Sequence, residues 1–228
     1  MEASLVGSEM CIRDRIIPVW LSDGSGTEMG KGHLGHRPSI ITSIHSDDNG
    51  ITWERGDIVC RHDDNIDGTI LINPSETIPV QLEDSSVMLN IRSESEIDRR
   101  LIAISPDGSS NWKIRGFDNA LLEPVCMASI LKSNQPSENE FKDIIFINPD
   151  NLENTMIPEG HNLRHDRKRL SAKLSFDDAK TWPVNKVIEE GPSGYSDVAQ
   201  LRSGEFLCIY ECETVSYTHL RAHETSFH

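Results

Sequence analysis

The sequence predicts an all-β fold of the β-propeller class, in which small antiparallel sheets recur as blades. Three observations predict it. The interior of the 228-residue chain consists of short runs rich in β-branched residues, bounded by Asp, Asn, Gly and Pro. No long segment places apolar residues at helical spacing. An octamer that ends in Trp occurs three times, and a repeated motif among many short strands favours a propeller over a β-sandwich.

The expected strands follow one another from Ile16. The first, 16–22, is apolar and leads into a glycine-rich loop at 23–36. The next segment alternates apolar and polar residues, as a half-buried strand does. The later segments are short apolar runs that end at turn residues. The expected strands after the first are 38–46, 51–59, 77–82, 86–93, 101–105, 125–132, 143–150, 170–175, 196–201 and 205–211.

The octamer has the composition of a tight turn between two strands. The three copies are SDDNGITW at 46–53, SPDGSSNW at 105–112 and SFDDAKTW at 175–182. Asp and Asn side chains accept hydrogen bonds from nearby backbone in turns, and Gly50 supplies a position with positive φ. We expect Asp48 to bind the loop amides and Trp53 to pack under the hairpin. Ala179 stands at the glycine position of the third octamer along the chain, and Ser109 at that of the middle one. We interpret the octamer as a structural staple that fixes the turn between two strands, and not as a catalytic element.

Composition and charge exclude several classes of function. The chain holds 37 acidic and 22 basic residues, a net charge of −15, so it should repel nucleic acid and anionic membranes. It has no apolar run of roughly 18 residues, so we expect no membrane span. The five Cys form no CxxC pair and the nine His show no metal-ligand spacing, so we expect neither a metal nor another cofactor.

The two ends differ from the interior. The segment LVGSEMCIRD near the N-terminus resembles a translated adapter used in preparing sequencing libraries. The segment VSYTHLRAHET near the C-terminus resembles a translation of the complementary strand of the same adapter. We therefore expect residues 1–15 and 214–228 to be non-native, and 16–213 to be an internal part of a propeller domain.

The octamer resembles the Asp-box, S-x-D-x-G-x-T-W, of sialidase-type propellers, and its first copy matches every fixed position. The interior resembles the sialidase family, the exo-acting neuraminidases, in four blocks. They are NPSETIPVQLEDSSVMLNIRS at 73–93, EPVCMASIL at 123–131, DRKRLSAKLSFDDAKTWP at 166–183 and GPSGYSDVAQL at 191–201. The resemblance implies a six-bladed β-propeller, here incomplete and without its first blades.

The resemblance also assigns catalytic roles. It makes Tyr195 the nucleophile and Glu76 the carboxylate that activates it. A sialoside carries a carboxylate on its anomeric carbon, which repels an anionic nucleophile. A neutral phenol avoids this repulsion, but its pKa near 10 requires a base. Sialidases therefore depart from the usual pair of catalytic carboxylates.

Arginines that bind the substrate carboxylate are implied as well. Arg92 matches one of the family's three, and Arg167 fits another best, with Arg164 and Arg169 as open alternatives. A guanidinium suits this task because it donates two parallel hydrogen bonds and stays charged. The resemblance also suggests Glu123 as a second pocket carboxylate.

Each residue has a structural alternative. Taken by itself, Glu76 could be a solvated turn residue, and Arg92 could pair with nearby acids such as Glu94. Arg167 lies in a basic run typical of a solvated face, and Tyr195 would suit the edge of a core. Their joint occurrence in family order favours the catalytic reading. For His36 and Arg37 a role in the loop is favoured over the alternative that they line the rim of the pocket.

Two parts of the family pattern do not occur in this chain: the Arg-Ile-Pro strand with the first arginine, and the Asp that acts as general acid and base. We expect a retaining exo-α-sialidase that releases terminal sialic acid from sialylated glycoconjugates, with this chain inactive alone. The alternatives are a non-catalytic propeller that binds glycan or protein, and a glycosidase or lyase acting on another sugar acid.

Overall fold

The computed structural model describes residues 15–28, 30–32, 34–134, 143–155 and 164–212, and the backbone of 219–225. This part of the chain contains fifteen β-strands and no helix, so the all-β prediction is confirmed. Consequently the described residues include no helix that could cross a membrane. The chain divides into two compact units, Met1–Asn119 and Ala120–His228.

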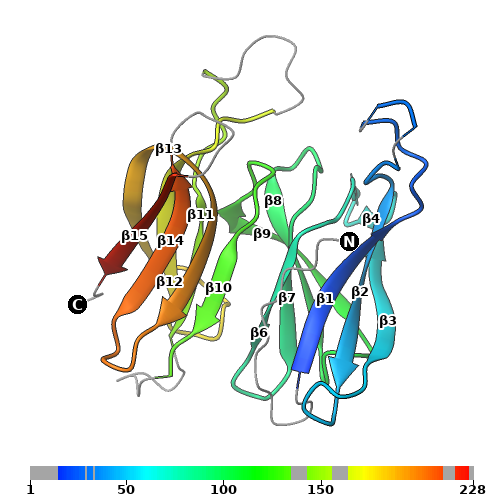
Figure 1. The fold of residues 1–228 in the computed structure, drawn as a ribbon, viewed down its shortest axis with the longest axis horizontal. Coiled ribbons are helices and arrows are strands. Elements are labelled where there is room, and N and C mark those ends of the chain that lie inside the picture. Colours follow the sequence, from blue (N-terminus) through cyan, green and yellow to red (C-terminus); the bar gives the residue numbers. More distant parts are fainter. Residues whose placement is uncertain are drawn as a thin grey trace. The chain divides into compact units, whose positions relative to one another are not determined.

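The first unit is built from antiparallel meanders. One sheet has the order β1-β2-β3, another the order β6-β7-β8-β9, and β4 and β5 form a small hairpin (Figure 1). The strands are β1 (Arg15–Ser22), β2 (Ser39–Ser46), β3 (Glu54–Arg61), β4 (Asn65–Ile66), β5 (Thr69–Ile70), β6 (Thr77–Gln81), β7 (Val87–Ile91), β8 (Arg99–Ser105) and β9 (Lys113–Leu122). Neighbours in sequence pair in space, as in the blades of a propeller.

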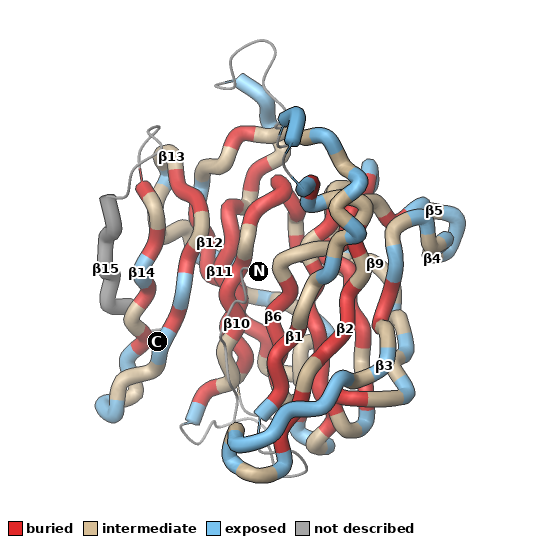
Figure 2. Tube along the Cα trace, turned by 45° about the vertical axis from the view of Figure 1, so that its right-hand side comes forward, coloured by how far each residue is buried: buried red, intermediate tan, exposed pale blue. Residues whose placement is uncertain are grey.

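The core of the first unit joins its two larger sheets. Ile16 of β1, Ile41 of β2, Leu89 of β7 and Leu101 of β8 belong to one apolar cluster and are fully buried. In Figure 2 buried positions run along β1 and β2, whereas the β4–β5 hairpin is largely exposed. The cluster shows why the alternating segments form strands, because one face of each sheet is covered by the other sheet.

The second unit is one six-stranded antiparallel sheet in sequence order. Its strands are β10 (Ser129–Lys132), β11 (Ile144–Pro149), β12 (Lys168–Ser175), β13 (Val184–Gln200), β14 (Phe206–Cys212) and β15 (His219–Thr225). The long β13 serves two pairings: its first half pairs with β12 and its second half with β14. The residues 219–225, expected to be non-native, pair with β14 as β15. Their adapter origin stays a prediction.

The octamers form the predicted staples. In the first, the Asp48 carboxylate accepts from the Thr52 amide at 2.8 Å and from the Thr52 hydroxyl at 2.6 Å. The Ser46 hydroxyl accepts from the Gly50 amide at 2.8 Å. In SFDDAKTW the same bonds recur with Ala179, which takes the glycine position at φ 60°.

The middle octamer differs from its predicted alignment. Gly108, not Ser109, donates its amide to Ser105 and has a positive φ of 73°. Ser110 takes the place of the threonine, since its amide and hydroxyl both donate to Asp107. The turn is one residue shorter before the hydroxyl residue, and Asn111 restores the spacing to the Trp.

This middle octamer also joins the two sheets of the first unit. The hydroxyl of Ser43 in β2 donates to the carbonyl of Gly108 at 2.9 Å, and the amide of Asp57 in β3 donates to the carbonyl of Ser109 at 2.7 Å. The three Trp rings behave differently. Trp112 packs on the core and Trp182 contacts Phe146, whereas Trp53 is 39% exposed. The Trp53 ring lies against its own turn as expected, because its Nε1 donates to the Gly50 carbonyl at 3.0 Å.

Candidate active site

Two predicted site residues meet in the first unit. Glu76 precedes β6 and Arg92 follows β7, and the β6–β7 register pairs the adjacent residues Thr77 and Ile91. The Arg92 amide donates to the Glu76 carbonyl at 3.3 Å, and the side chains form an ion pair. Glu76 is 19% exposed and Arg92 13%. Glu76 is therefore not a solvated turn residue, and Arg92 pairs with Glu76 as its cross-strand neighbour.

A second polar cluster lies beside this pair and was missed by the sequence analysis. Glu94 accepts from Asn73 Nδ2 at 3.0 Å and from Arg37 Nε at 3.1 Å. Asn73 has a φ of 44°, and its amide donates to His62 Nδ1 at 3.1 Å. Asparagine adopts this left-handed conformation more readily than most residues. An Asn before Pro in the segment ahead of Glu76 was the available signal.

Arg37 occupies the loop position expected for it. It lies two residues before β2, and its guanidinium forms an ion pair with Glu94 while remaining 40% exposed. His36 makes an edge contact with the Trp20 ring, with the centroids 5.5 Å apart.

The other two predicted residues meet in the second unit. The Arg167 guanidinium lies over the Tyr195 ring, with its central carbon 5.2 Å from the ring centroid. This is within the range of a cation–π contact. One terminal nitrogen of Arg167 also donates to the Val125 carbonyl at 2.6 Å. The arginine is thus held between the Tyr195 ring and the loop before β10.

Of the three arginines considered for this role, Arg167 contacts Tyr195, whereas Arg169 pairs with an acidic residue elsewhere. Arg169 is 48% exposed and lies 3.6 Å from Glu190. It sits at a register shift between β12 and β13, with a φ of 59°, which turns its side chain away from the regular strand pattern. Arg164 lies in the loop before β12. Arg167 is therefore the arginine that the fold places against the predicted nucleophile.

Glu123 supports the backbone. It is 1% exposed, and its carboxylate accepts from the Cys126 amide at 2.9 Å. The enclosed turn contains Val125 at φ 61°, and Val125 is the residue whose carbonyl holds Arg167. The structure thus gives Glu123 a bond that shapes the turn under Arg167; a role as pocket carboxylate stays a prediction.

The four predicted residues form two pairs. Glu76 and Arg92 belong to the first unit, and Tyr195 and Arg167 to the second. The approach of the Tyr195 hydroxyl to Glu76 stays a prediction.

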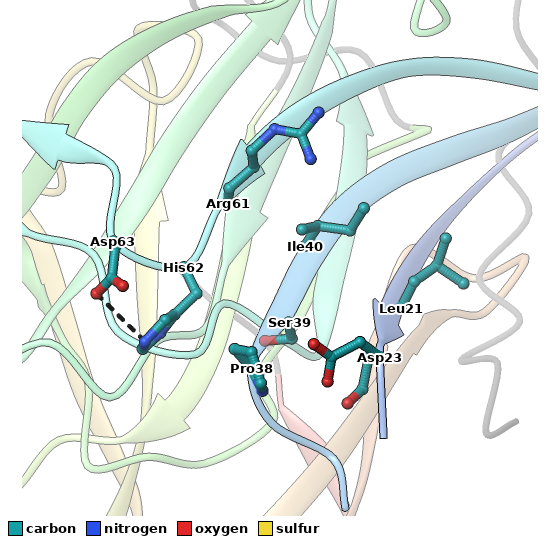
Figure 3. A pocket seen from close by; sticks show the side chains of 9 residues that line it. Leu21, Asp23, Pro38, Ser39, Ile40, Arg61, His62 and Asp63 are labelled. Atoms are coloured by element: carbon teal, nitrogen blue, oxygen red, sulfur yellow. Dashed lines mark ion pairs between the residues drawn. The ribbon is translucent and has the colours of Figure 1, made fainter. Parts of the chain in front are cut away.

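The first unit also contains a cavity whose lining includes none of these four residues. It has a volume of ≈ 500 Å³ and opens at one end of the β1–β3 sheet (Figure 3). His62 and Asp63 line it, with His62 Nε2 3.2 Å from Asp63 Oδ1. Its lining is Leu21, Ser22, Asp23, Pro38, Ser39, Ile40, Arg61, His62 and Asp63. No group of three or more His, Cys, Asp or Glu within the described segments is arranged to hold a metal ion.

Comparison with known proteins defines the class of this chain. Residues 37–208 match the family model of the BNR repeat-like domain, so the chain belongs to that family. Its relatives include the sialidase of Micromonospora viridifaciens, 28% identical over 172 residues, which are 74% of this chain and 23% of the relative. A sialidase of Bacteroides fragilis is 26% identical over 208 residues, which are 86% and 34%. The chain spans about a quarter to a third of the relatives' lengths.

Solved structures show the same fold. A Hadza microbial sialidase superposes with a TM-score of 0.61 at 23% identity, over 88% of this chain and 34% of that one. The intramolecular trans-sialidase from Ruminococcus gnavus superposes with a TM-score of 0.61 at 18% identity, over 91% and 38%. The predicted sialidase-type propeller fold and the predicted family resemblance are both confirmed.

Proposed function

We propose that this chain is the part of a retaining exo-α-sialidase that carries its nucleophile, the base for that nucleophile and two carboxylate-binding arginines. The observation that supports this most directly is the pairing of each arginine with one catalytic candidate: Arg92 with Glu76, and Arg167 with Tyr195. Each catalytic candidate thereby has a guanidinium, a group that binds carboxylates, directly beside it. The relatives are sialidases, and their name supplies the substrate class.

The proposed reaction begins with proton transfer from the Tyr195 hydroxyl to the Glu76 carboxylate. The phenolate oxygen attacks the anomeric carbon, and the bond to the leaving glycan breaks. The leaving oxygen takes a proton from a general acid, for which this chain contains no residue in the family's context. Water then displaces Tyr195 from the sugar and gives a proton back to the deprotonated general acid, while Glu76 returns its proton to the phenolate. The product keeps the original anomeric configuration.

Arg92 and Arg167 bind the substrate carboxylate. A guanidinium has five N–H donors, so Arg92 can hold Glu76 and a substrate oxygen at the same time. Fixed positive charge next to the anomeric carbon offsets the repulsion between the carboxylate and an approaching nucleophile. The ion pair with Glu76 orients Arg92 before substrate arrives, which reduces the cost of ordering it on binding.

The test uses the uninterrupted protein from the same DNA and a fluorogenic methylumbelliferyl α-sialoside. Tyr195→Phe and Glu76→Gln should each lower kcat by at least about 10²-fold, because each removes a group that moves a proton or forms a bond. Arg92→Lys and Arg167→Lys should chiefly raise KM. Arg169→Lys is the matched control, since Arg169 faces Glu190, and should stay near wild type.

Four outcomes would contradict the proposal. Wild-type kcat in Tyr195→Phe excludes a phenol nucleophile, and an inverted first product, seen by NMR, excludes a retaining mechanism. Hydrolysis by the present chain alone would refute its proposed inactivity. Binding of sialyllactose without hydrolysis by the uninterrupted protein would favour the non-catalytic alternative.

A further inference from the structure

The strand that carries Tyr195 contains a β-bulge at that residue. In the pairing of β13 with β14, Ser193 is opposite Cys212 and Ser196 is opposite Tyr210. Two residues of β13, Gly194 and Tyr195, therefore face the single residue Glu211 of β14. Such an extra residue bends a strand and redirects its side chains, and bulges are common next to active sites.

The Glu211 side chain fills the space that the bulge creates. Its Oε2 accepts a hydrogen bond from the Tyr195 amide at 3.0 Å. That amide has lost its regular ladder position, and a backbone donor removed from water needs a partner. Glu211 thus compensates for the pairing that the bulge disrupts.

Gly194 makes room for this contact. A Cβ atom at Gly194 would overlap Glu211 Oε2 and lie 3.4 Å from Glu211 Cβ. Any side chain at this position would displace the carboxylate that accepts from the Tyr195 amide. Gly194 is required here for space, because its φ is not among the positive values.

The bulge is also fixed to the strand that carries Arg167. The Ser193 amide donates to the Arg167 carbonyl at 3.0 Å, and the Ser193 hydroxyl accepts from the Leu170 amide at 3.1 Å. Ser193, which directly precedes the bulge, is therefore bonded to the backbone of Arg167, and the Tyr195 ring lies under the Arg167 guanidinium. Side chains alternate along a strand, so removal of the extra residue would turn Tyr195 or the residues after it to the opposite face.

We propose that Glu211 is a positioning residue for Tyr195: by accepting the Tyr195 amide in the bulge at Gly194, it holds the ring under Arg167. Its importance for catalysis rests on the proposed function, whereas its effect on the Tyr195 ring does not. The proposal assigns the role to the reach of the Glu211 side chain rather than to its charge. Two conservative variants separate reach from charge.

Glu211→Gln keeps the length and an acceptor oxygen but loses the charge. Glu211→Asp keeps the charge, but its carboxylate is one methylene further from the amide. In the present chain with 13C-labelled tyrosine, Tyr195→Phe identifies the Tyr195 ring signal in NMR spectra. Glu211→Gln should leave that signal close to its wild-type position, whereas Glu211→Asp and Gly194→Ala should shift it and should speed hydrogen exchange of the Tyr195 amide. The Tyr210 ring signal, from the neighbouring strand residue, is the internal control.

The result that overturns the proposal is an unchanged Tyr195 signal in Glu211→Asp, or a shift at Tyr210 as large as that at Tyr195, which would indicate a general loss of structure. A larger effect in Glu211→Gln than in Glu211→Asp would show that charge, not reach, matters. In the uninterrupted protein, Glu211→Asp should lower kcat by about 10-fold to 10²-fold with little change in KM, as misplacement of a reacting group by about 1 Å does. Failure of this kinetic result alone, with the expected NMR shift, would count against the proposed nucleophile and leave the positioning intact.

Discussion

Alanine at Gly108 in the middle octamer is predicted to lower the free energy of unfolding far more than alanine at Gly50 in the first octamer. Both have positive φ, 73° and 87°, so alanine strains the backbone at either position. Their surroundings differ. A Cβ at Gly108 would overlap Cδ1 of the fully buried Ile16 and lie 2.9 Å from Val87 Cγ2. A Cβ at Gly50 would meet its nearest neighbour, Arg15 Cδ, at 3.5 Å, an ordinary contact distance.

The expected magnitudes follow from these contacts. A left-handed conformation costs a residue with a Cβ about 1–2 kcal/mol, and this applies to both variants. Forcing a methyl group into a packed core adds about 1–3 kcal/mol, and this applies to Gly108→Ala alone. Stabilisation through the unfolded chain is the same for both and cancels in the comparison. Gly108→Ala should therefore lose about 2–5 kcal/mol of unfolding free energy, and Gly50→Ala about 1–2 kcal/mol.

Urea unfolding followed by Trp fluorescence measures both values, and three of the four Trp (Trp20, Trp53 and Trp112) lie in the first unit. Ala179 provides an independent reference, because it is an alanine that the chain already tolerates at the equivalent turn position with φ 60°. Equal losses in Gly108→Ala and Gly50→Ala would refute the reasoning, since they would show that the contact with Ile16 and Val87 carries no cost.

Two further predictions concern titratable groups. Hydrogen bonds from the Thr52 hydroxyl and amide lower the pKa of Asp48 from its ordinary value of 3.8 to about 2, so its stabilising effect is complete above about pH 4 and is lost as the pH falls towards 2. The urea midpoint should fall over that range, and Asp48→Asn should fall less steeply; parallel curves would contradict this. Burial, with a contribution from Asp64, raises the pKa of Cys60 to about 12, and burial with Asp197 does the same for Cys208. Iodoacetamide at pH 8 should modify both thiols far more slowly in the native chain than in urea, as read by mass spectrometry of the peptides, and equal rates would show that these thiols are not buried.

The sequence determined the fold class and the chemistry of the turns, because both depend on local patterns. Short alternating runs predicted most of the strands, and the octamer pattern predicted that its Asp accepts hydrogen bonds from loop amides. The resemblance to sialidases selected Glu76, Arg92, Arg167 and Tyr195 before any geometry was available.

Only the tertiary structure decided which side chains meet. β9 and the first half of β13 were missed because their many exposed polar residues obscure the alternation that marks a strand. The octamer at 105–112 was misaligned because its turn is one residue shorter, which shows only in which amide reaches Ser105. The Asn73–Glu94–Arg37 cluster and the bond from Tyr195 to Glu211 join residues 16 to 57 positions apart. Strand register sets such contacts, and register depends on long-range pairing that local sequence does not encode.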